Sequence, residues 1–370
     1  MDIIKLLQLA KSKSASDLHM VVSKPPLFRI HGNLSPADDL PELTAEDIEQ
    51  ALEQITTEQE RADFERCLEL DLGRSIPDTG RTRINAAKQR GTTSLVIRLL
   101  PPEIPDPDTL GLPRVCKELI LRPRGLVVVS GPTGSGKSTT LASMINHLNK
   151  TESRCVITIE DPIEYTYDHI NCTITQRELG HDTLSFAEAL RHVLRQDPDV
   201  ILVGEMRDLE TASAVLTVAE TGHLVLTTGH APSAAQAVER ITNMFPPHER
   251  HMAQDRLASL LLGILCQSLV PRADGSGRVA AIEVMLANPA VRNLIREGKT
   301  YQLPNTIRMN TQHGMELLDQ ALVRLYRDGK ISRESVFDFC NDKEEIVKLT
   351  GEREDKSQNE KDLSYSTQFN

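Results

Sequence analysis

The sequence predicts an α/β protein in which a small α/β domain precedes a larger domain built on a parallel sheet. The chain has 370 residues, more than one hydrophobic core usually organises. A proline-rich stretch at 101–113 separates two halves with different patterns. In the second half, short apolar runs alternate with helical patterns, which is typical of a parallel sheet covered by helices.

Composition narrows the class of protein. Hydrophobic residues make up 39% and charged residues 26%, the balance of an ordinary soluble protein, while aromatics are only 3% and the core must consist mainly of Leu, Ile and Val. The count of 42 Lys plus Arg against 53 Asp plus Glu gives a net charge of −11, which argues against a nucleic-acid partner. So few aromatics also leave little for base stacking.

The spacing of the cysteines and the hydropathy of the chain give no indication of disulfides, of a zinc site or of a membrane-spanning segment. The six cysteines form no C-x-x-C pair, so we expect reduced thiols and no zinc site. Nowhere do enough apolar residues run together to span a bilayer. We therefore expect no direct membrane insertion and a cytoplasmic location, with any attachment to a membrane made through a partner.

The first domain is predicted at residues 1–100. Ile48, Leu52 and Ile55 repeat at helical spacing, whereas 82–86 and 94–99 have the pattern of extended strands. The prolines of 101–113 suit a stiff connector rather than a core element. The domain boundary is placed in this connector.

The second domain is predicted at 114–342. Its strand-length apolar runs are at 126–129, 156–159, 200–203 and 224–227, and a later strand at 279–286 precedes further helices. Residues 343–370 are charged and polar, so we predict a disordered tail.

A glycine-rich loop at 131–138, GPTGSGKS, follows the first of these runs and precedes an apolar helix face. It matches the phosphate-binding loop, in which backbone N–H groups curl around phosphates. Lys137 is expected to reach the outer phosphates and Ser138 to ligate Mg²⁺. A glycine-rich turn that binds nothing is the alternative. The predicted nucleotide-binding residues are Gly131, Pro132, Thr133, Gly134, Ser135, Gly136, Lys137, Ser138 and Thr139.

Glu205 follows the buried run 200–203, at the carboxyl edge of the sheet where ligands of open α/β sheets bind. A carboxylate there can orient and deprotonate an attacking water, so Glu205 is the predicted general base and a second candidate metal ligand beside Ser138. A solvated loop acid is the alternative. Asp199 precedes the same strand and lies at the wrong end for metal.

Other polar residues flank two further strands. Glu160, Asp161 and Glu164 follow 156–159 and are candidate assistants of catalysis beside Mg²⁺, although helix capping explains them equally well. His223 and His230 bracket 224–227. His230 is a candidate catalytic residue, and structural hydrogen bonding is its alternative role.

The order of these motifs, with Gly222-His223 and Gly229-His230, resembles the type IV pilus and type II secretion ATPase superfamily. Within it, the chain is most similar to the pilus retraction ATPases. The supporting segments lie at 16–19 (SDLH), 81–85 (RTRIN), 204–208 (GEMRD) and 290–297 (AVRNLIRE).

The resemblance implies a PAS-like N-terminal domain joined to a RecA-like ATPase domain with a helical C-terminal part. It also implies an ATP- and Mg²⁺-dependent homohexamer that drives pilus retraction and twitching motility from the inner face of the cytoplasmic membrane, where its partner is an inner-membrane pilus platform protein. Arg83 and Arg98 match arginines that contribute to the phosphate site, and Arg81 is a weaker candidate.

The sequence departs from the family at two places. Residues 229–233 read GHAPS, without the hydroxyl and amide groups that relatives carry after the histidine. Positions 82 and 87, aromatic in many relatives, are Thr82 and Ala87. The first departure predicts the loss of a polar contact near His230. The second predicts a different packing of the first domain and leaves the nucleotide-binding residues untouched.

Three other functions are alternatives for this sequence. A pilus assembly or type II secretion ATPase usually has a larger N-terminal region and often a four-cysteine zinc module, and neither is found here. A nucleic-acid translocase conflicts with the acidic charge. A ring that does not hydrolyse ATP conflicts with the presence of Lys137, Ser138 and Glu205.

The segment 290–297 carries the preference for retraction over assembly. Asn288 is a predicted cap and Pro289 a predicted first residue of a helix. Val291, Leu294 and Ile295 should face inward. Arg292, Asn293, Arg296 and Glu297 should face outward, so that replacing both arginines spares folding. A merely solvated face is the alternative.

Overall fold

The structure, a computed structural model, describes residues 1–30, 32–37, 40–100 and 103–351. These form two compact units, one of Met1–Asp106 with Ala142–Gly204 and the other of Pro107–Leu141 with Glu205 onward. Within the described ranges, no helix is both long and apolar enough to cross a membrane.

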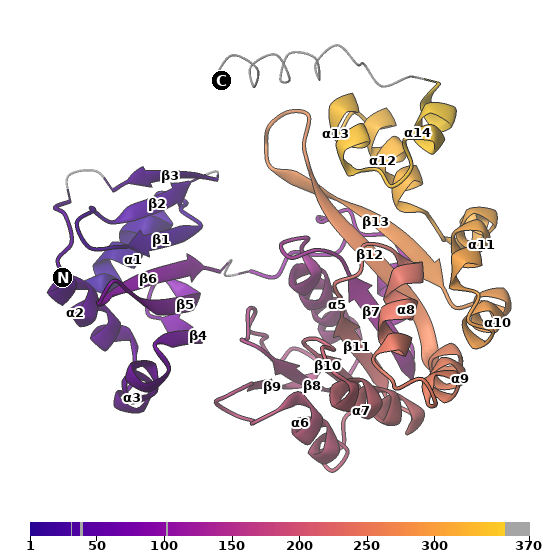
Figure 1. The fold of residues 1–370 in the computed structure, drawn as a ribbon, viewed down its shortest axis with the longest axis horizontal. Coiled ribbons are helices and arrows are strands. Elements are labelled where there is room, and N and C mark those ends of the chain that lie inside the picture. The colour runs from indigo at the N-terminus through magenta and orange to yellow at the C-terminus, as the bar shows by residue number, and fades with distance from the viewer. Residues whose placement is uncertain (31, 38–39, 101–102, 352–370) are drawn as a thin grey trace. The chain divides into compact units, whose positions relative to one another are not determined.

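A six-stranded antiparallel sheet organises the N-terminal part of the first unit (Figure 1). Its order is β3-β2-β1-β6-β5-β4. Capping boxes start two of the helices that cover it, through Thr44 with Asp47 and Thr57 with Glu60. Apolar side chains of these helices share one core with the strands. The strands are β1 (Asp17–Met20), β2 (Leu27–Ile30), β3 (Asn33–Pro36), β4 (Glu69–Ile76), β5 (Gly80–Gln89) and β6 (Thr92–Leu99), and the helices are α1 (Ile3–Ser12), α2 (Ala45–Ile55) and α3 (Glu58–Cys67).

Three parallel strands complete the first unit. They run in the order β10-β8-β9, and the register pairs Val200 with Val156 and Val203 with Ile159. All four residues of β10 are buried, as expected for a parallel strand covered on both faces. The elements are β8 (Cys155–Glu160), β9 (Thr173–Glu178), α6 (Phe186–Val193) and β10 (Val200–Val203), together with most of α5 (Lys137–Thr151).

The second unit is built on four strands in the order β13-β12-β7-β11. β7 is parallel to both β11 and β12, and β12 forms an antiparallel hairpin with β13. The strands are β7 (Gly125–Ser130), β11 (Leu224–Thr228), β12 (Leu261–Pro271) and β13 (Arg278–Leu286). The helices are α4 (Val115–Ile120), α7 (Leu209–Glu220), α8 (Ala234–Asn243), α9 (Arg250–Leu260), α10 (Pro289–Arg296), α11 (Leu303–Met309), α12 (Leu318–Arg327), α13 (Arg333–Phe339) and α14 (Lys343–Thr350), with short 3-10 turns at Thr300–Gln302 and Thr311–His313.

The α/β fold class and every strand predicted above are confirmed, since the predicted segments fall inside β5, β6, β7, β8, β10, β11 and β13. The compact units divide the chain differently from the predicted domains, because residues 142–204 group with the first unit. The boundaries at 100 and 113 stay a prediction, and residues 101 and 102 of the connector lie outside the described residues.

The predicted start of the disordered tail at residue 343 is wrong. Lys343–Thr350 form α14, whose first turn is capped by the Asp342 carboxylate. Ile346 is fully buried in a core cluster with α12 and α13. This buried side chain and the Asp342 cap stabilise a helix in a segment whose composition is mostly polar. Residues 352–370 of the predicted tail lie outside the described residues.

The prediction that Arg292 belongs to an outward, unpartnered face of segment 290–297 is wrong, as the structure of α10 shows. Asn288 caps the helix and Val291 and Ile295 are buried, as expected. Arg292 is not free, because its guanidinium donates to the carbonyl oxygens of Ala258, Ser259, Leu261 and Ala287. Two of these acceptors belong to the last turn of α9, where carbonyls lack partners within the helix. Arg292 therefore holds α10 against the end of α9, and Arg296 remains exposed.

Arg292→Ala should lower the free energy of unfolding by about 1–3 kcal/mol, because several carbonyls lose a charged donor at once. Arg296→Ala is the matched control and should leave it unchanged. Arg292→Lys should recover only part of the loss, since one ammonium cannot span four acceptors. The measurement is the urea midpoint of the three purified variants. Equal midpoints for the Arg292 and Arg296 alanine variants would show that α10 does not need this contact.

Candidate functional site

The loop 131–136 joins the buried strand β7 to α5 through three glycines with positive φ. The angles are 141° at Gly131, 77° at Gly134 and 88° at Gly136, a region that side chains with a Cβ rarely adopt. At Gly131 a Cβ would also lie 2.2 Å from the backbone oxygen of Gln267. The loop can therefore be built only with glycine at this position.

The loop presents unpaired backbone donors. Among the described residues, the N–H groups of Gly134, Gly136 and Ser138 have no acceptor in the protein. Gly134 faces open space, and the Ser135 hydroxyl is buried without a hydrogen-bond partner. Converging amides at the start of α5 attract anions through the helix dipole as well. These residues fit the phosphate groups of a nucleotide.

Lys137 and Ser138 begin α5 with different surroundings. The Lys137 ammonium is buried inside the loop and donates to the carbonyl oxygens of Gly131, at 2.8 Å, and Pro132, at 3.1 Å. Ser138 is exposed, as are Pro132 and Thr133. No group of three or more His, Cys, Asp or Glu side chains able to hold a metal ion occurs in the described ranges. The Ser138 hydroxyl is the side chain of the loop that could ligate a metal ion bound with the phosphates.

Gln267 of β12 is a residue in contact with the loop that sequence reasoning missed. Its side chain is buried, with Nε2 donating to the Ser135 carbonyl and Oε1 accepting from the Thr140 hydroxyl, both at 2.7 Å. Its backbone oxygen is the atom that excludes a side chain from position 131. One residue thus contacts the beginning, the middle and the helical end of the loop. The available signal was a single amide within the apolar run LLGILCQSLVP.

The structure brings the two candidate residues Glu205 and His230 together. Glu205 is only 8% exposed. Its Oε2 lies 3.5 Å from His230 Nε2 and its Oε1 lies 2.5 Å from the Arg207 guanidinium. Arg207 was not foreseen as a neighbour of this carboxylate, and its side chain is two-thirds exposed at 67%. The arrangement places a carboxylate beside an imidazole and a guanidinium, within reach of the groups with which a proton acceptor works.

A buried hydroxyl ties the residue after His230 to the base of the loop. Ser130, the last residue of β7, donates to the Ala231 carbonyl at 2.7 Å and accepts from the Ala231 amide at 2.8 Å. The parallel register also pairs Thr228 with Val129. Glu205, His230 and the glycine loop therefore meet at the carboxyl ends of β7 and β11.

The carboxylates after β8 lie in a different environment. Burial raises the pKa of Glu160 to about 7, although hydrogen bonds from Thr158, at 2.7 Å, and Gln176, at 3.1 Å, act in the opposite direction. Such a carboxyl exchanges its proton near neutral pH. Glu164 contributes, with Asp161, to the raised pKa of Arg83, whose first cause is the hydrogen bond to Asp71.

Arg83 and Arg98 lie directly opposite each other on β5 and β6, so both side chains leave the same face of the sheet. Each of the two guanidinium groups is paired with an aspartate of the same unit. Arg83 makes a forked contact with Asp71, with Nη2 to Oδ2 at 2.7 Å, and Arg98 Nε donates to Asp17 at 2.8 Å. Arg81 instead donates to Glu178 and to the Ile163 carbonyl. The structure therefore brings the two predicted arginines together, each held by an aspartate.

Comparison with known proteins matches the chain to secretion and pilus ATPases. Residues 5–338 match the family described as Type II/IV secretion system protein. The chain is 44% identical over 335 residues to the type IV pilus retractation ATPase PilT of Pseudomonas aeruginosa, which covers 90% of this chain and 97% of that relative. It is 41% identical over 355 residues to the type IV pilus ATPase PilU of the same organism, which covers 95% and 93%. The crystal structure of the pilus retraction motor PilT with bound ADP superimposes with a TM-score of 0.87 at 42% identity, over 94% of this chain and 99% of that one.

Gln267→Leu should weaken nucleotide binding about tenfold, because the Ser135 carbonyl and the Thr140 hydroxyl both lose a buried partner. Gln267→Glu keeps the shape and the bond from Thr140 but sets a carboxylate oxygen against the Ser135 carbonyl, so it should bind at least as poorly. Ser268→Ala, one residue along β12, is the control. Titration with a fluorescent ADP analogue measures the affinity. Wild-type affinity in the leucine variant would contradict a positioning role for Gln267.

Proposed function

Since the chain belongs to the Type II/IV secretion system protein family, we propose that it is an ATP-hydrolysing motor that powers the retraction of type IV pili. The observation that carries the proposal is the agreement with PilT over 90% of the chain, together with a glycine loop whose free amides suit phosphates. The resemblance inferred from the motifs led to the same family.

In this proposal the nucleotide is ATP and the glycine loop holds its phosphates. The amides of Gly134, Gly136 and Ser138 donate to phosphate oxygens, and the Lys137 ammonium exchanges its loop carbonyls for the outer phosphates. Pro132, Thr133 and Thr139 complete the cradle. Mg²⁺, when bound, neutralises charge that develops on the phosphoryl group. Ser138 is its expected protein ligand, with Glu205 the second candidate.

Glu205 is proposed as the general base that orients and deprotonates the attacking water. His230 lies beside its Oε2 and can help to hold the carboxylate or share its proton. Arg207 occupies the other oxygen, and its exposed side chain can leave without disturbing packing. Glu160, with a pKa of about 7, and Glu164 are the proposed assisting carboxylates.

The proposed assembly is a homohexamer, because relatives of the pilus retraction class work as rings according to the resemblance given above. Arg83 and Arg98 would then contribute to a phosphate site, each exchanging an aspartate for a phosphate oxygen. An inner-membrane pilus platform protein is the proposed partner, which would place the motor in the cytoplasm at the inner face of the membrane. The acidic net charge is unfavourable for a nucleic-acid track.

Lys137→Ala should reduce ATP hydrolysis by about 100-fold or more, because a buried cation at the outer phosphates is lost. Glu205→Gln should bind ATP normally but lose hydrolysis to a similar extent, since the amide cannot accept the proton from water. Glu210→Gln, an exposed change nearby on α7, is the control. Phosphate release and nucleotide affinity are measured for each. If Glu205→Gln turns over normally while Glu160→Gln or Glu164→Gln does not, the base has been assigned to the wrong carboxylate.

Deletion of the gene in its host should leave cells with excess surface pili and no twitching. Wild-type protein should restore twitching on complementation, Glu205→Gln should not, and Arg296→Ala should fail although its ATPase rate is normal. Piliation is scored by electron microscopy and twitching by spreading on a surface. Cells without pili would favour the assembly function instead. Normal twitching with Arg296→Ala would show that α10 only covers the core and has no role of its own in retraction.

A further inference from the structure

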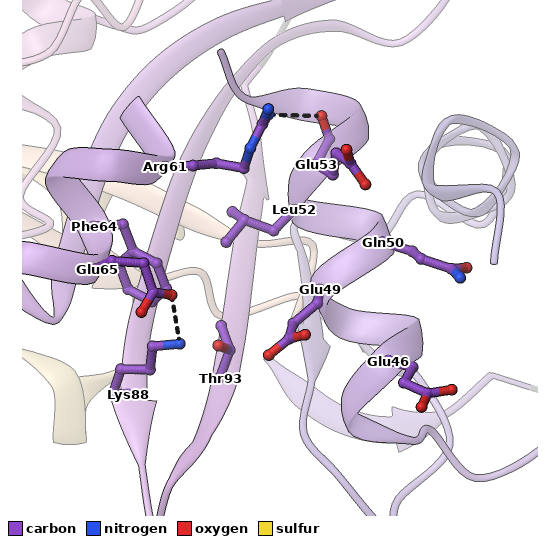
Figure 2. Close-up of a pocket in the computed structure, with 10 residues that line it drawn as sticks. All are labelled: Glu46, Glu49, Gln50, Leu52, Glu53, Arg61, Phe64, Glu65, Lys88 and Thr93. Carbon is purple, nitrogen blue, oxygen red and sulfur yellow. Dashed lines mark hydrogen bonds and ion pairs between the residues drawn. The ribbon is translucent and has the colours of Figure 1, made fainter. Parts of the chain in front are cut away.

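The N-terminal domain contains a pocket that takes no part in the proposed ATP chemistry. It has a volume of about 490 Å³ and lies among α2, α3 and the strands β5 and β6 (Figure 2). Its apolar lining is Leu52 and Phe64, both buried. Polar side chains form the remainder of the wall. The pocket therefore has an apolar floor and a charged rim.

The cations of the rim are already engaged. Lys88 lies 2.8 Å from the Glu65 carboxylate and 5.0 Å from the centre of the Phe64 ring. Arg61 donates to the Thr56 carbonyl at 2.9 Å and to the Glu53 carbonyl at 3.5 Å, near the end of α2. The rim therefore has two cations, Arg61 and Lys88, against the four acids Glu46, Glu49, Glu53 and Glu65.

Three exposed glutamates of α2 lie on this rim, Glu46, Glu49 and Glu53. Their carboxylates have no hydrogen-bond or ion-pair partner within the described part of the chain. Spacings of three and four residues put them on one side of the helix. Figure 2 shows the Glu49 carboxylate turned toward Thr93 and Lys88. The pocket thus carries an uncompensated negative charge.

Thr93 supplies a second, independent sign of a ligand. The residue is 1% exposed, it lines the pocket, and its hydroxyl oxygen has no hydrogen-bond partner. A buried hydroxyl left unsatisfied costs free energy, and such groups in folded proteins normally have a partner. The hydroxyl can both accept and donate, so it can be satisfied by a group that enters the pocket.

We propose that this pocket binds a lysine or arginine side chain presented by a segment of a basic partner protein. The cationic head would pair with Glu49 and donate to the Thr93 hydroxyl, and the aliphatic stem would pack on Leu52 and Phe64. Such side chains bury their stems on apolar surface while keeping the charge at a polar rim. The Phe64 ring already accepts a cation from this chain, and the net charge of −11 favours an unlike, basic partner over a second copy.

A fluorescein-labelled peptide of alternating arginine and alanine is the probe, titrated into the full-length protein at 150 mM salt with fluorescence anisotropy as the readout. Glu49→Gln with Glu53→Gln should weaken binding about tenfold, because charged hydrogen bonds are lost. Glu42→Gln with Glu69→Gln changes the net charge equally at exposed sites of the same domain that do not line the pocket. This control should bind as the wild type does.

Thr93→Val separates a built site from diffuse attraction, since it changes no charge, keeps the branched shape and removes a hydroxyl that has no partner to lose. It should weaken binding about threefold while the urea midpoint and the ATPase rate stay unchanged. Three results would overturn the proposal: equal weakening by both double variants, wild-type binding by Thr93→Val, or binding of free spermidine as tight as that of the peptide. The last result would assign the pocket to a small polyamine.

Discussion

The close approach of the loop backbone to β12 is the constraint on which the rest of the site depends. The backbone oxygen of Gln267 lies only 2.2 Å from the place that a Cβ of residue 131 would take, so the chain turns here with a glycine at positive φ. That turn directs the following amides to one side, where α5 begins. The Gln267 side chain then fixes the middle of the loop and the first turn of the helix. Phosphate binding by a backbone requires this rigidity, because a flexible loop would lose entropy on each binding event.

The parallel strands bring the other candidate site residues to the edge of the sheet where the loop begins. β7 and β11 run side by side in one direction, so their carboxyl ends deliver the loop and His230 to the same edge. The Ser130 hydroxyl fastens the chain after β11 to the last residue of β7. Glu205 reaches the same edge and meets His230. Ala231, which follows His230, uses only its backbone in the contact with Ser130.

Sequence patterns predicted those features of the fold and of the candidate site that depend on neighbouring residues in the chain. The glycines, the buried strand runs and the cap of α10 were all readable, because steric limits and hydrophobic periodicity act over a few residues. Three features were not readable. Gln267 lies more than a hundred residues from the loop that it holds, Arg292 turns inward because α9 ends beside it, and α14 is ordered by the burial of Ile346. Each depends on which elements become neighbours, and no window of sequence contains that information.

The two arginines of the β5–β6 pair differ in how readily they could exchange an aspartate for a phosphate. Arg83 is paired with Asp71, whose side chain is 44% exposed, and water can take over the carboxylate when the guanidinium leaves. Arg98 is paired with Asp17, which is almost fully buried. Burial tends to raise the pKa of Asp17, yet hydrogen bonds from Arg98 and Ser16 hold it below its ordinary value. Removing Arg98 would strip a buried carboxylate of its main partner, which costs more than separating a surface pair. Arg83 is therefore the arginine better placed to move to a nucleotide, and Arg98 the one better suited to keep β1 and β6 together.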